Sequence, residues 1–251
     1  MRAYEKKVFC LGEHLDRLSG SCRGIGRRLP LSALEIGRWL QTALKEARIA
    51  DALLRLSVHW KGANEGAMLL IASEFHAHPR QWYEEGVKLK TAVQRRSNPK
   101  AQDSQVKASQ FMGGVLAHLS EAGRDFHELV FLDQRGMVAE GTVSNIFILE
   151  KKRLLTPSVS SGILRVVTRG VALELAQKRR FKIQETRLTR HEVYAADECF
   201  LTNTSSEILP VVSLDGRVIG NGKPGAVTRI LMTDFKSRIE QFKKKLMVLS
   251  R

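Results

Sequence analysis

Cysteine is scarce in this sequence. The 251-residue chain has three cysteines, and Cys10, Cys22 and Cys199 lie far apart, with no CxxC pair among them. This scarcity excludes a small domain held together by disulfides, and the spacing excludes a zinc site built on thiolates. We expect the three thiols to be reduced and mostly buried, as in a cytoplasmic protein.

Long apolar runs are also lacking. The longest run, Ala67–Ala72, is far too short to cross a bilayer. The first residues, Met1–Cys10, do not contain the uninterrupted apolar stretch of a signal peptide. We therefore expect no membrane partner and a cytoplasmic location.

Aromatic and acidic residues are few compared with basic ones. Aromatics make up 6% of the chain, and 26 Asp and Glu stand against 41 Lys and Arg, which gives a net charge of +15. Such an excess can attract nucleic acid. However, the densest basic groups are not interleaved with the aromatics that a base-stacking surface needs; they are Arg23–Arg28, Lys88–Arg96, Lys178–Lys182 and Lys236–Lys245. We expect solvated charge with a general preference for small anions, and no nucleic-acid partner.

Apolar periodicity predicts an α+β domain over residues 1–94. A helix is expected from Ser32 to about Ala50, because Ser32 and Glu35 form a capping box ahead of apolar residues at helical spacing. Three strand-like runs follow, at Leu54–Trp60, Ala67–Ser73 and Val87–Val93.

Residues 95–104 are polar, contain a proline and have no periodicity, which predicts an interdomain linker. Residues 105–251 then form the second domain. It is predicted to contain a helix over Gln105–Glu121, another over about Ile163–Arg180 and a basic helix over Ala226–Leu246. Short strands separated by tight turns lie between them and are best explained as antiparallel hairpins. The predicted fold class is a two-domain α+β protein.

Ordered local motifs narrow the interpretation further. They are Glu140-Gly-Thr-Val-Ser-Asn-Ile-Phe147, Leu155-Thr-Pro157, Ile163-Leu164 with Thr168-Arg169, and Ala196-Asp-Glu-Cys-Phe-Leu-Thr-Asn-Thr204. In this order and spacing, the chain resembles the class IV, fold type IV aminotransferases from about Ala3 to Leu231. That family uses pyridoxal phosphate and includes branched-chain aminotransferases, D-amino-acid aminotransferases and aminodeoxychorismate lyases. The resemblance implies a small N-terminal α/β domain and a larger C-terminal domain of antiparallel sheets and helices.

The resemblance also implies catalytic roles for two residues. Lys107 would form the Schiff base with the cofactor, since a deprotonated amine can attack the aldehyde and later move a proton at the α-carbon. Glu140 would pair with the pyridine nitrogen and keep the ring protonated. Without the resemblance, Lys107 would be an ordinary surface residue in a first helical turn, and Glu140 a solvated residue ending a hairpin strand. Asn145 is expected to buttress the hairpin beside Glu140.

The phosphate of the cofactor needs cations and free backbone N–H groups. The resemblance implies that Arg17 supplies the cation and that Val167 and Thr168 begin a helix whose amides and dipole favour an anion. Thr204, with the neighbouring Ser205, would complete the phosphate site.

Some positions depart from the family pattern. Met112 stands where branched-chain enzymes usually have tyrosine, and Val58–Gly62 stands where several subfamilies have a substrate arginine. Val166 replaces a glycine, so a positive φ there would be strained. Family members also carry roughly thirty residues before the stretch that matches Arg2–Phe9. We expect the small domain to lack its opening strands and to have an unpaired sheet edge.

Three hypotheses follow. The first is a homodimeric, pyridoxal-phosphate-dependent aminotransferase that acts on an amino acid and a 2-oxo acid, of branched-chain or D-amino-acid type. The second is an aminodeoxychorismate lyase, which releases pyruvate. The third is a non-catalytic basic binding homologue.

Overall fold

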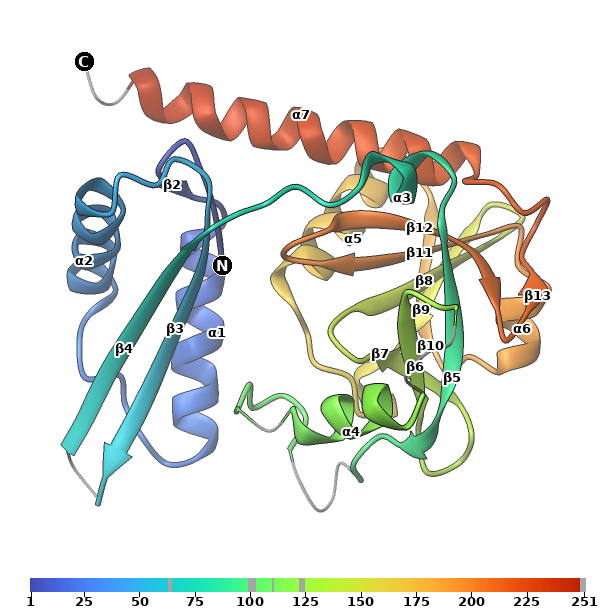
Figure 1. Cartoon of the computed structure of the whole chain (residues 1–251), viewed down its shortest axis with the longest axis horizontal. Coiled ribbons are helices and arrows are strands. Elements are labelled where there is room, and N and C mark those ends of the chain that lie inside the picture. The colour runs from blue at the N-terminus through green and yellow to red at the C-terminus, as the bar shows by residue number, and fades with distance from the viewer. Residues whose placement is uncertain (63–64, 99–102, 110, 122–124, 249–251) are drawn as a thin grey trace. The chain divides into compact units, whose positions relative to one another are not determined.

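The computed structural model describes residues 1–62, 65–98, 103–109, 111–121 and 125–248. The chain divides into two compact units (Figure 1). The small unit comprises Met1–Ala77 together with Lys236–Arg251, and the large unit comprises His78–Phe235. No helix in the described ranges is long and apolar enough to cross a membrane.

The small unit is a four-stranded sheet with two helices. Its strands lie in the order β2-β1-β3-β4, and all neighbours are antiparallel. The elements are β1 (Arg2–Tyr4), β2 (Lys7–Val8), α1 (Leu11–Gly24), α2 (Ala33–Glu46), β3 (Ala52–Lys61) and β4 (Glu65–Glu74). Among the described residues, β4 pairs only with β3, so it forms one edge of the sheet.

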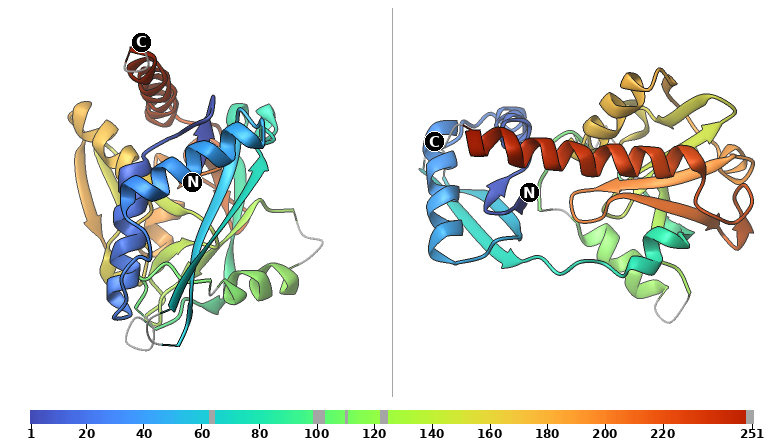
Figure 2. Two further views of the ribbon diagram at one scale, coloured as in Figure 1. Left: turned by 90° about the vertical axis from the view of Figure 1, so that its left-hand side faces the viewer. Right: turned by 90° about the horizontal axis from the view of Figure 1, so that it is seen from above.

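The two helices lie beside the sheet of the small unit (Figure 2) and bury their apolar faces against it. Leu15 of α1 and Ile36, Leu40 and Leu44 of α2 pack with alternate residues of β3, including Leu54. Helix α2 starts as the sequence predicts. The Ser32 side chain accepts a hydrogen bond from the Glu35 amide, and the Glu35 carboxylate accepts one from the Ser32 amide, which satisfies otherwise unpaired N–H groups.

The large unit is built on a nine-stranded mixed sheet. The strand order is β10-β9-β8-β11-β12-β5-β6-β7, with β13 beside β12. The strands are β5 (Val87–Arg95), β6 (Glu128–Leu132), β7 (Val138–Gly141), β8 (Asn145–Glu150), β9 (Arg153–Pro157), β10 (Lys182–Thr186), β11 (Glu198–Asn203), β12 (Glu207–Leu214) and β13 (Arg217–Val218). The helices are α3 (Arg80–Glu84), α4 (Met112–Ser120), the 3₁₀ turn η1 (Val159–Ser161), α5 (Val167–Lys178), α6 (Arg190–Tyr194) and α7 (Ala226–Val248), whose second half belongs to the small unit.

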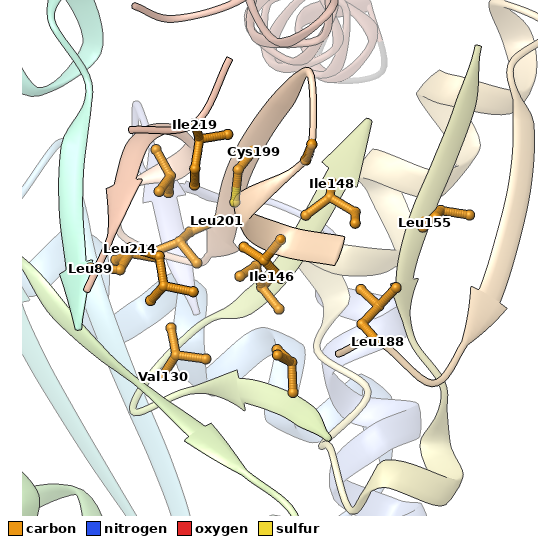
Figure 3. Close-up of a cluster of buried hydrophobic side chains, with 14 of the residues drawn as sticks. Leu89, Val130, Ile146, Ile148, Leu155, Leu188, Cys199, Leu201, Leu214 and Ile219 are labelled. Atoms are coloured by element: carbon orange, nitrogen blue, oxygen red, sulfur yellow. The ribbon is translucent and has the colours of Figure 1, made fainter. Parts of the chain in front are cut away.

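The large sheet curls on itself. The amide of Val138, at the start of β7, donates to the carbonyl of Leu188, which follows β10 at the opposite end of the strand order. Alternate side chains of the strands meet inside the curl, and Figure 3 shows Ile146, Leu201 and Leu214 among them. This core fixes the strand ends on which the polar residues described below lie.

The structure corrects the predicted domain boundary. The division falls between Ala77 and His78, and not at residues 95–104, of which 99–102 lie outside the described residues. The reason is that β5 pairs in parallel with β6 and β12 of the large sheet, and does not join the small one. The parallel pairs of β5, and of β9 with β10, also make the large sheet mixed, whereas the sequence predicted antiparallel hairpins.

The predicted helix over Gln105–Glu121 is shorter in the structure. Helix α4 begins at Met112, and Lys107 lies in the preceding loop. A turn explains the difference: the Asp103 carboxylate accepts from the Gln105 amide, and the Asp103 carbonyl accepts from the Val106 amide. These local bonds compete with helical ones.

Candidate active site

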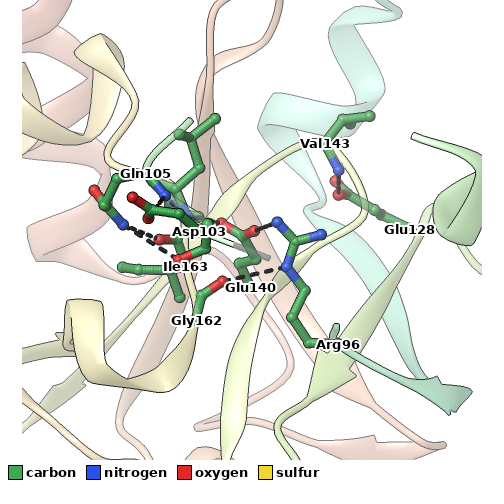
Figure 4. Close-up of polar contacts among 11 residues, drawn as sticks. Arg96, Asp103, Gln105, Glu128, Glu140, Val143, Gly162 and Ile163 are labelled. Atoms are coloured by element: carbon green, nitrogen blue, oxygen red, sulfur yellow. Dashed lines mark hydrogen bonds and ion pairs between the residues drawn. The ribbon is translucent and has the colours of Figure 1, made fainter. Parts of the chain in front are cut away.

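Glu140 is a buried carboxylate of the large unit with three polar partners. It lies on β7 and is 6% exposed. The Arg96 guanidinium Nη2 lies 2.7 Å from Oε1, while Oε2 accepts hydrogen bonds from Asn145 Nδ2 at 3.0 Å and from the Leu164 amide at 2.9 Å (Figure 4). An ionised carboxylate can accept about four hydrogen bonds, so room for another donor remains.

Burial raises the pKa of Glu140 to about 7. Positive charge on Arg96, the hydrogen bond from the Leu164 amide and the charge on Lys107 each oppose that rise, and negative charge on Glu128 adds to it. Because Lys107 acts on this pKa, Lys107 and Glu140 lie within electrostatic range of each other. A carboxyl group with a pKa near neutrality can hold or share a proton at physiological pH.

The expectation for Asn145 is confirmed. Its side-chain amide donates to Glu140 and also to the Leu164 carbonyl, at 3.1 Å, so it joins the hairpin to the segment that follows η1. The side-chain oxygen of Asn145 is buried and has no partner among the described residues.

The loop that carries Lys107 is anchored to the same segment. Gln105 Nε2 donates to the carbonyl of Ile163 at 2.6 Å, and Arg96 Nε donates to the carbonyl of Gly162 at 3.3 Å (Figure 4). Lys107 itself is exposed. Residues 162–164 therefore connect the lysine loop, Arg96 and Glu140.

A second buried carboxylate, Glu128, shapes the turn after Glu140. It is 3% exposed at the start of β6. It accepts hydrogen bonds from the Val143 amide at 2.8 Å, the Ser144 hydroxyl at 2.9 Å and the Thr142 hydroxyl at 3.3 Å. Three consecutive residues are thus tied to one carboxylate, and burial raises its pKa.

The predicted anion-binding helix begins at Val167, as the resemblance implies, and not at Ile163, where the periodicity predicted its start. Val167 and Thr168 are the first two residues of α5, and no side chain caps this helix. Its first amides are therefore available to an anion. Val166 has φ −90° and ψ 152°, an extended conformation open to any residue, so the positive φ that would strain this position does not occur.

Thr204 and Ser205 lie in the turn between β11 and β12. The Ser205 amide and hydroxyl both donate to Asn203 Oδ1, at 2.9 and 3.0 Å, and the Ser206 amide donates to the same atom at 2.7 Å. Asn203 thus fixes this turn. The buried hydroxyl of Ser206 has no partner among the described residues.

Arg17 belongs to the other unit, where it lies on α1. Its Nη2 is 3.4 Å from Nδ1 of His14, one turn earlier on the helix. The role of Arg17 beside Thr168 or Thr204 stays a prediction.

Arg96, Gln105 and Glu128 were missed as site residues by sequence reasoning. Arg96 was one cation in the basic group Lys88–Arg96, and Gln105 was one polar residue of a predicted helix. Glu128 gave one available signal, because a carboxylate directly precedes the apolar run Leu129–Leu132 and is thereby carried into the interior. No group of His, Cys, Asp or Glu suited to a metal ion occurs in the described part of the chain.

Comparisons with known proteins point to one family. The family model for class IV amino-transferases matches residues 1–214. A branched-chain-amino-acid aminotransferase of Pseudomonas aeruginosa is 31% identical over 245 residues, which is 92% of this chain and 80% of that protein. A D-alanine aminotransferase of Bacillus licheniformis is 28% identical, over 95% of this chain and 86% of that protein. The crystal structure of the T.th. branched-chain amino acid aminotransferase with pyridoxamine 5′-phosphate superposes with a TM-score of 0.86 at 26% identity, covering 93% of this chain and 81% of that one.

Proposed function

The chain belongs to the class IV aminotransferase family, and from that premise we propose that Lys107 and Glu140 are the centre of its active site. The protein is a pyridoxal-phosphate-dependent aminotransferase. The observation that carries the residue assignment is the buried Glu140 carboxylate, held by Arg96, Asn145 and the Leu164 amide within electrostatic range of Lys107.

The residues of the large unit fit the cofactor. Buried polar atoms without a partner in the described ranges lie on Asn145 and Thr202, which are directly paired across β8 and β11, and on Ser206 just beyond β11. The uncapped start of α5 adds backbone donors for a phosphate group. When bound, pyridoxal phosphate supplies an electron sink for bond changes at the α-carbon.

Lys107 and Glu140 have complementary tasks in this proposal. The Lys107 amine attaches the cofactor covalently and carries a proton to and from the α-carbon of the substrate. The Glu140 carboxylate holds a proton at the pyridine nitrogen, since one of its acceptor positions remains open. Arg96 and the Leu164 amide keep Glu140 in place for that contact.

Phosphate binding falls to Arg17, Val167, Thr168, Thr204 and Ser205. Backbone amides at the start of α5 supply oriented donors, and Arg17 supplies a full charge. Ser205 contributes through the turn that Asn203 fixes, because its own hydroxyl and amide are both engaged with Asn203.

The substrates we propose are an amino acid and a 2-oxo acid, of branched-chain or D-amino-acid type. Support for each type comes from a similar protein, one named for branched-chain amino acids and the other for D-alanine. None of these similarities favours the lyase or the non-catalytic alternative.

The test is to load the purified protein with pyridoxal phosphate, reduce it with borohydride and map the modified peptide. We expect the label on Lys107 and its loss in Lys107→Ala, with Lys152→Ala, an exposed lysine on the β8–β9 turn, as the matched control. Amino transfer is then followed with L-leucine and D-alanine as separate donors and 2-oxoglutarate as acceptor. A label on another lysine would refute the assignment, and release of pyruvate from aminodeoxychorismate without any acceptor would favour the lyase.

We further propose a homodimer that uses α4. The helix exposes an apolar face, with Met112 64%, Leu116 51% and Leu119 67% accessible, and a face of this kind is a common contact between chains. The pair Leu116→Lys and Leu119→Lys should lower the mass measured by light scattering to that of a monomer. The exposed pair Leu69→Lys and Ile71→Lys on β4 is the control.

A cytoplasmic location is part of the same proposal. Its support is that Cys10, Cys22 and Cys199 form no disulfide within the described part of the chain. Fractionation of the native cells, with antibody detection, tests it.

A further inference from the structure

A cavity of about 440 Å³ opens on the large unit away from Glu140. It is bounded by β5, the β12–β13 hairpin and α6, which lie side by side in Figure 1. Volumes of roughly 300 to 1,000 Å³ are typical of sites for small molecules. None of the residues assigned to the active site lines it.

Arginine dominates the charged lining. Arg95 comes from the end of β5, Arg190 from α6 and Arg217 from β13, and the single acidic residue of the lining is Asp215. None of the three arginines forms an ion pair with a residue in the described ranges. The cavity therefore has an excess of positive charge that the described side chains do not neutralise.

Asp215 organises the wall and leaves the arginines to a ligand. Its carboxylate accepts from the Thr91 amide and the Thr91 hydroxyl, both at 2.6 Å, and from the Tyr194 hydroxyl at 2.8 Å. Uncharged donors thus occupy three of the roughly four acceptor positions of the Asp215 carboxylate. The carboxylate joins β5 to α6 and contributes little to pairing with arginine.

The backbone and an aromatic ring hold Arg217 in place. Asp215 and Gly216 have φ of 54° and 75°, the left-handed pair that a tight two-residue hairpin turn requires. Beyond this turn, the Arg217 guanidinium lies over the Tyr194 ring, with its carbon 4.4 Å from the ring centroid. The cation is fixed at the cavity before any ligand arrives.

We propose that this cavity is a binding site for a small molecule that bears a phosphate group. Guanidinium groups match phosphate oxygens with paired N–H donors, and a phosphate dianion suits several unpaired cations better than a single carboxylate does. Val93, 77% exposed at the wall, offers apolar contact to the remainder of the ligand. Arg95 and Arg96 are consecutive, so one residue serves this cavity while the next holds Glu140.

The experiment titrates pyrophosphate into the cofactor-loaded protein at fixed ionic strength and measures heat. Loading occupies the other phosphate site before the titration begins. We expect saturable binding that weakens at least tenfold in Arg190→Gln with Arg217→Gln, because two charge-assisted contacts are lost. The control pair, Arg135→Gln with Arg187→Gln, removes the same charge from exposed positions outside the cavity and should change the affinity less than about twofold.

Three results would overturn the proposal. They are the absence of saturable binding to the unmodified protein, equal weakening in both variant pairs, and binding of succinate as tight as that of pyrophosphate at the same ionic strength. All four arginines are exposed, so both variant pairs should fold, and their melting temperatures verify this. If the Arg190 and Arg217 pair nevertheless melts early, Arg95→Gln alone is titrated and must weaken binding.

Discussion

Arg96 and Glu140 form an ion pair, with Nη2 of the arginine 2.7 Å from Oε1 of the glutamate. The two side chains of this pair differ in their exposure to solvent. The Glu140 side chain is 8% exposed and that of Arg96 is 28% exposed. The carboxylate is thus the member that loses most of its hydration. Its charge depends on the arginine, the Asn145 amide and the Leu164 amide.

Arg96→Gln should destabilise the large unit by about 2 to 3 kcal/mol, because it leaves a buried carboxylate without its cation. The double variant Arg96→Gln with Glu140→Gln should recover part of that loss, since no charge then remains buried. Urea denaturation followed by circular dichroism gives both values. Equal losses in the single and double variants would show that the pair has no coupling.

The stability of the cofactor-free protein should fall as pH rises. Glu140 has a pKa of about 7 in the folded state, against an ordinary value of about 4.5. Between these values the folded protein holds a proton that the unfolded chain has released, so the contribution is complete below about pH 4.5 and lost above about pH 7. Its size is at most roughly 3 kcal/mol.

The measurement compares unfolding of the unmodified protein and Glu140→Gln from pH 4.5 to 8. The difference between the two free energies should decrease through this window. A difference that stays constant, or that grows with pH, would contradict a raised pKa at Glu140.

Glu128→Ala should cost about 2 to 4 kcal/mol, because the Thr142 and Ser144 hydroxyls and the Val143 amide lose a shared acceptor. Glu128→Gln keeps an acceptor oxygen and should recover more than half of the loss. Removing the charge near Glu140 should also lower the pKa of Glu140, which the pH dependence above detects. An unchanged pH profile in Glu128→Gln would rule out the electrostatic link.

Gly141→Ala tests the same turn from the other side. An added Cβ would lie 2.3 Å from both Glu128 Oε1 and Ser144 Oγ, and these two side chains are buried and hydrogen-bonded to each other. We expect a loss of about 1 to 3 kcal/mol from this overpacking. The control is Gly113→Ala, because an added Cβ at Gly113 would meet no atom and Gly113 has no positive φ. Gly136→Ala is unsuitable as a control, because Gly136 has a φ of +80°. Thermal unfolding of Gly141→Ala and Gly113→Ala should therefore differ clearly.

Local signals in the sequence predicted much of the fold. The Ser32 and Glu35 capping box forms as the side-chain spacing predicts, and Thr189 and Glu192 form the same kind of pair at the start of α6. They succeed because the partners are three residues apart and need no tertiary contact. The partners of β5 could not be predicted in this way, because strand pairing joins Val87 to Val211 across the whole large unit.

The same difference between local and long-range contacts applies to the residues of the candidate site. Motif order indicated Glu140 and Asn145, which are five residues apart in the chain and are joined by a side-chain hydrogen bond. Arg96 is 44 residues before Glu140 in the chain and reaches it only because β5 and β7 flank β6. Apolar residues at helical spacing from Ala108 to Leu119 predicted a helix that includes Lys107, and a turn at Asp103 together with the bond from Gln105 to the distant Ile163 carbonyl prevents it.

Gln105→Ala should affect cofactor attachment more than stability. Gln105 Nε2 donates to the Ile163 carbonyl at 2.6 Å, and one partly buried bond of this kind contributes about 1 kcal/mol to folding. Its loss frees the loop that carries Lys107, and with the role proposed for this lysine, cofactor attachment should slow severalfold. Stopped-flow absorbance after mixing with pyridoxal phosphate measures the rate. Gln81→Ala, which breaks a side-chain bond to Glu85 on α3, should leave that rate unchanged. Equal rates in the two variants would mean that the bond from Gln105 does not position the lysine.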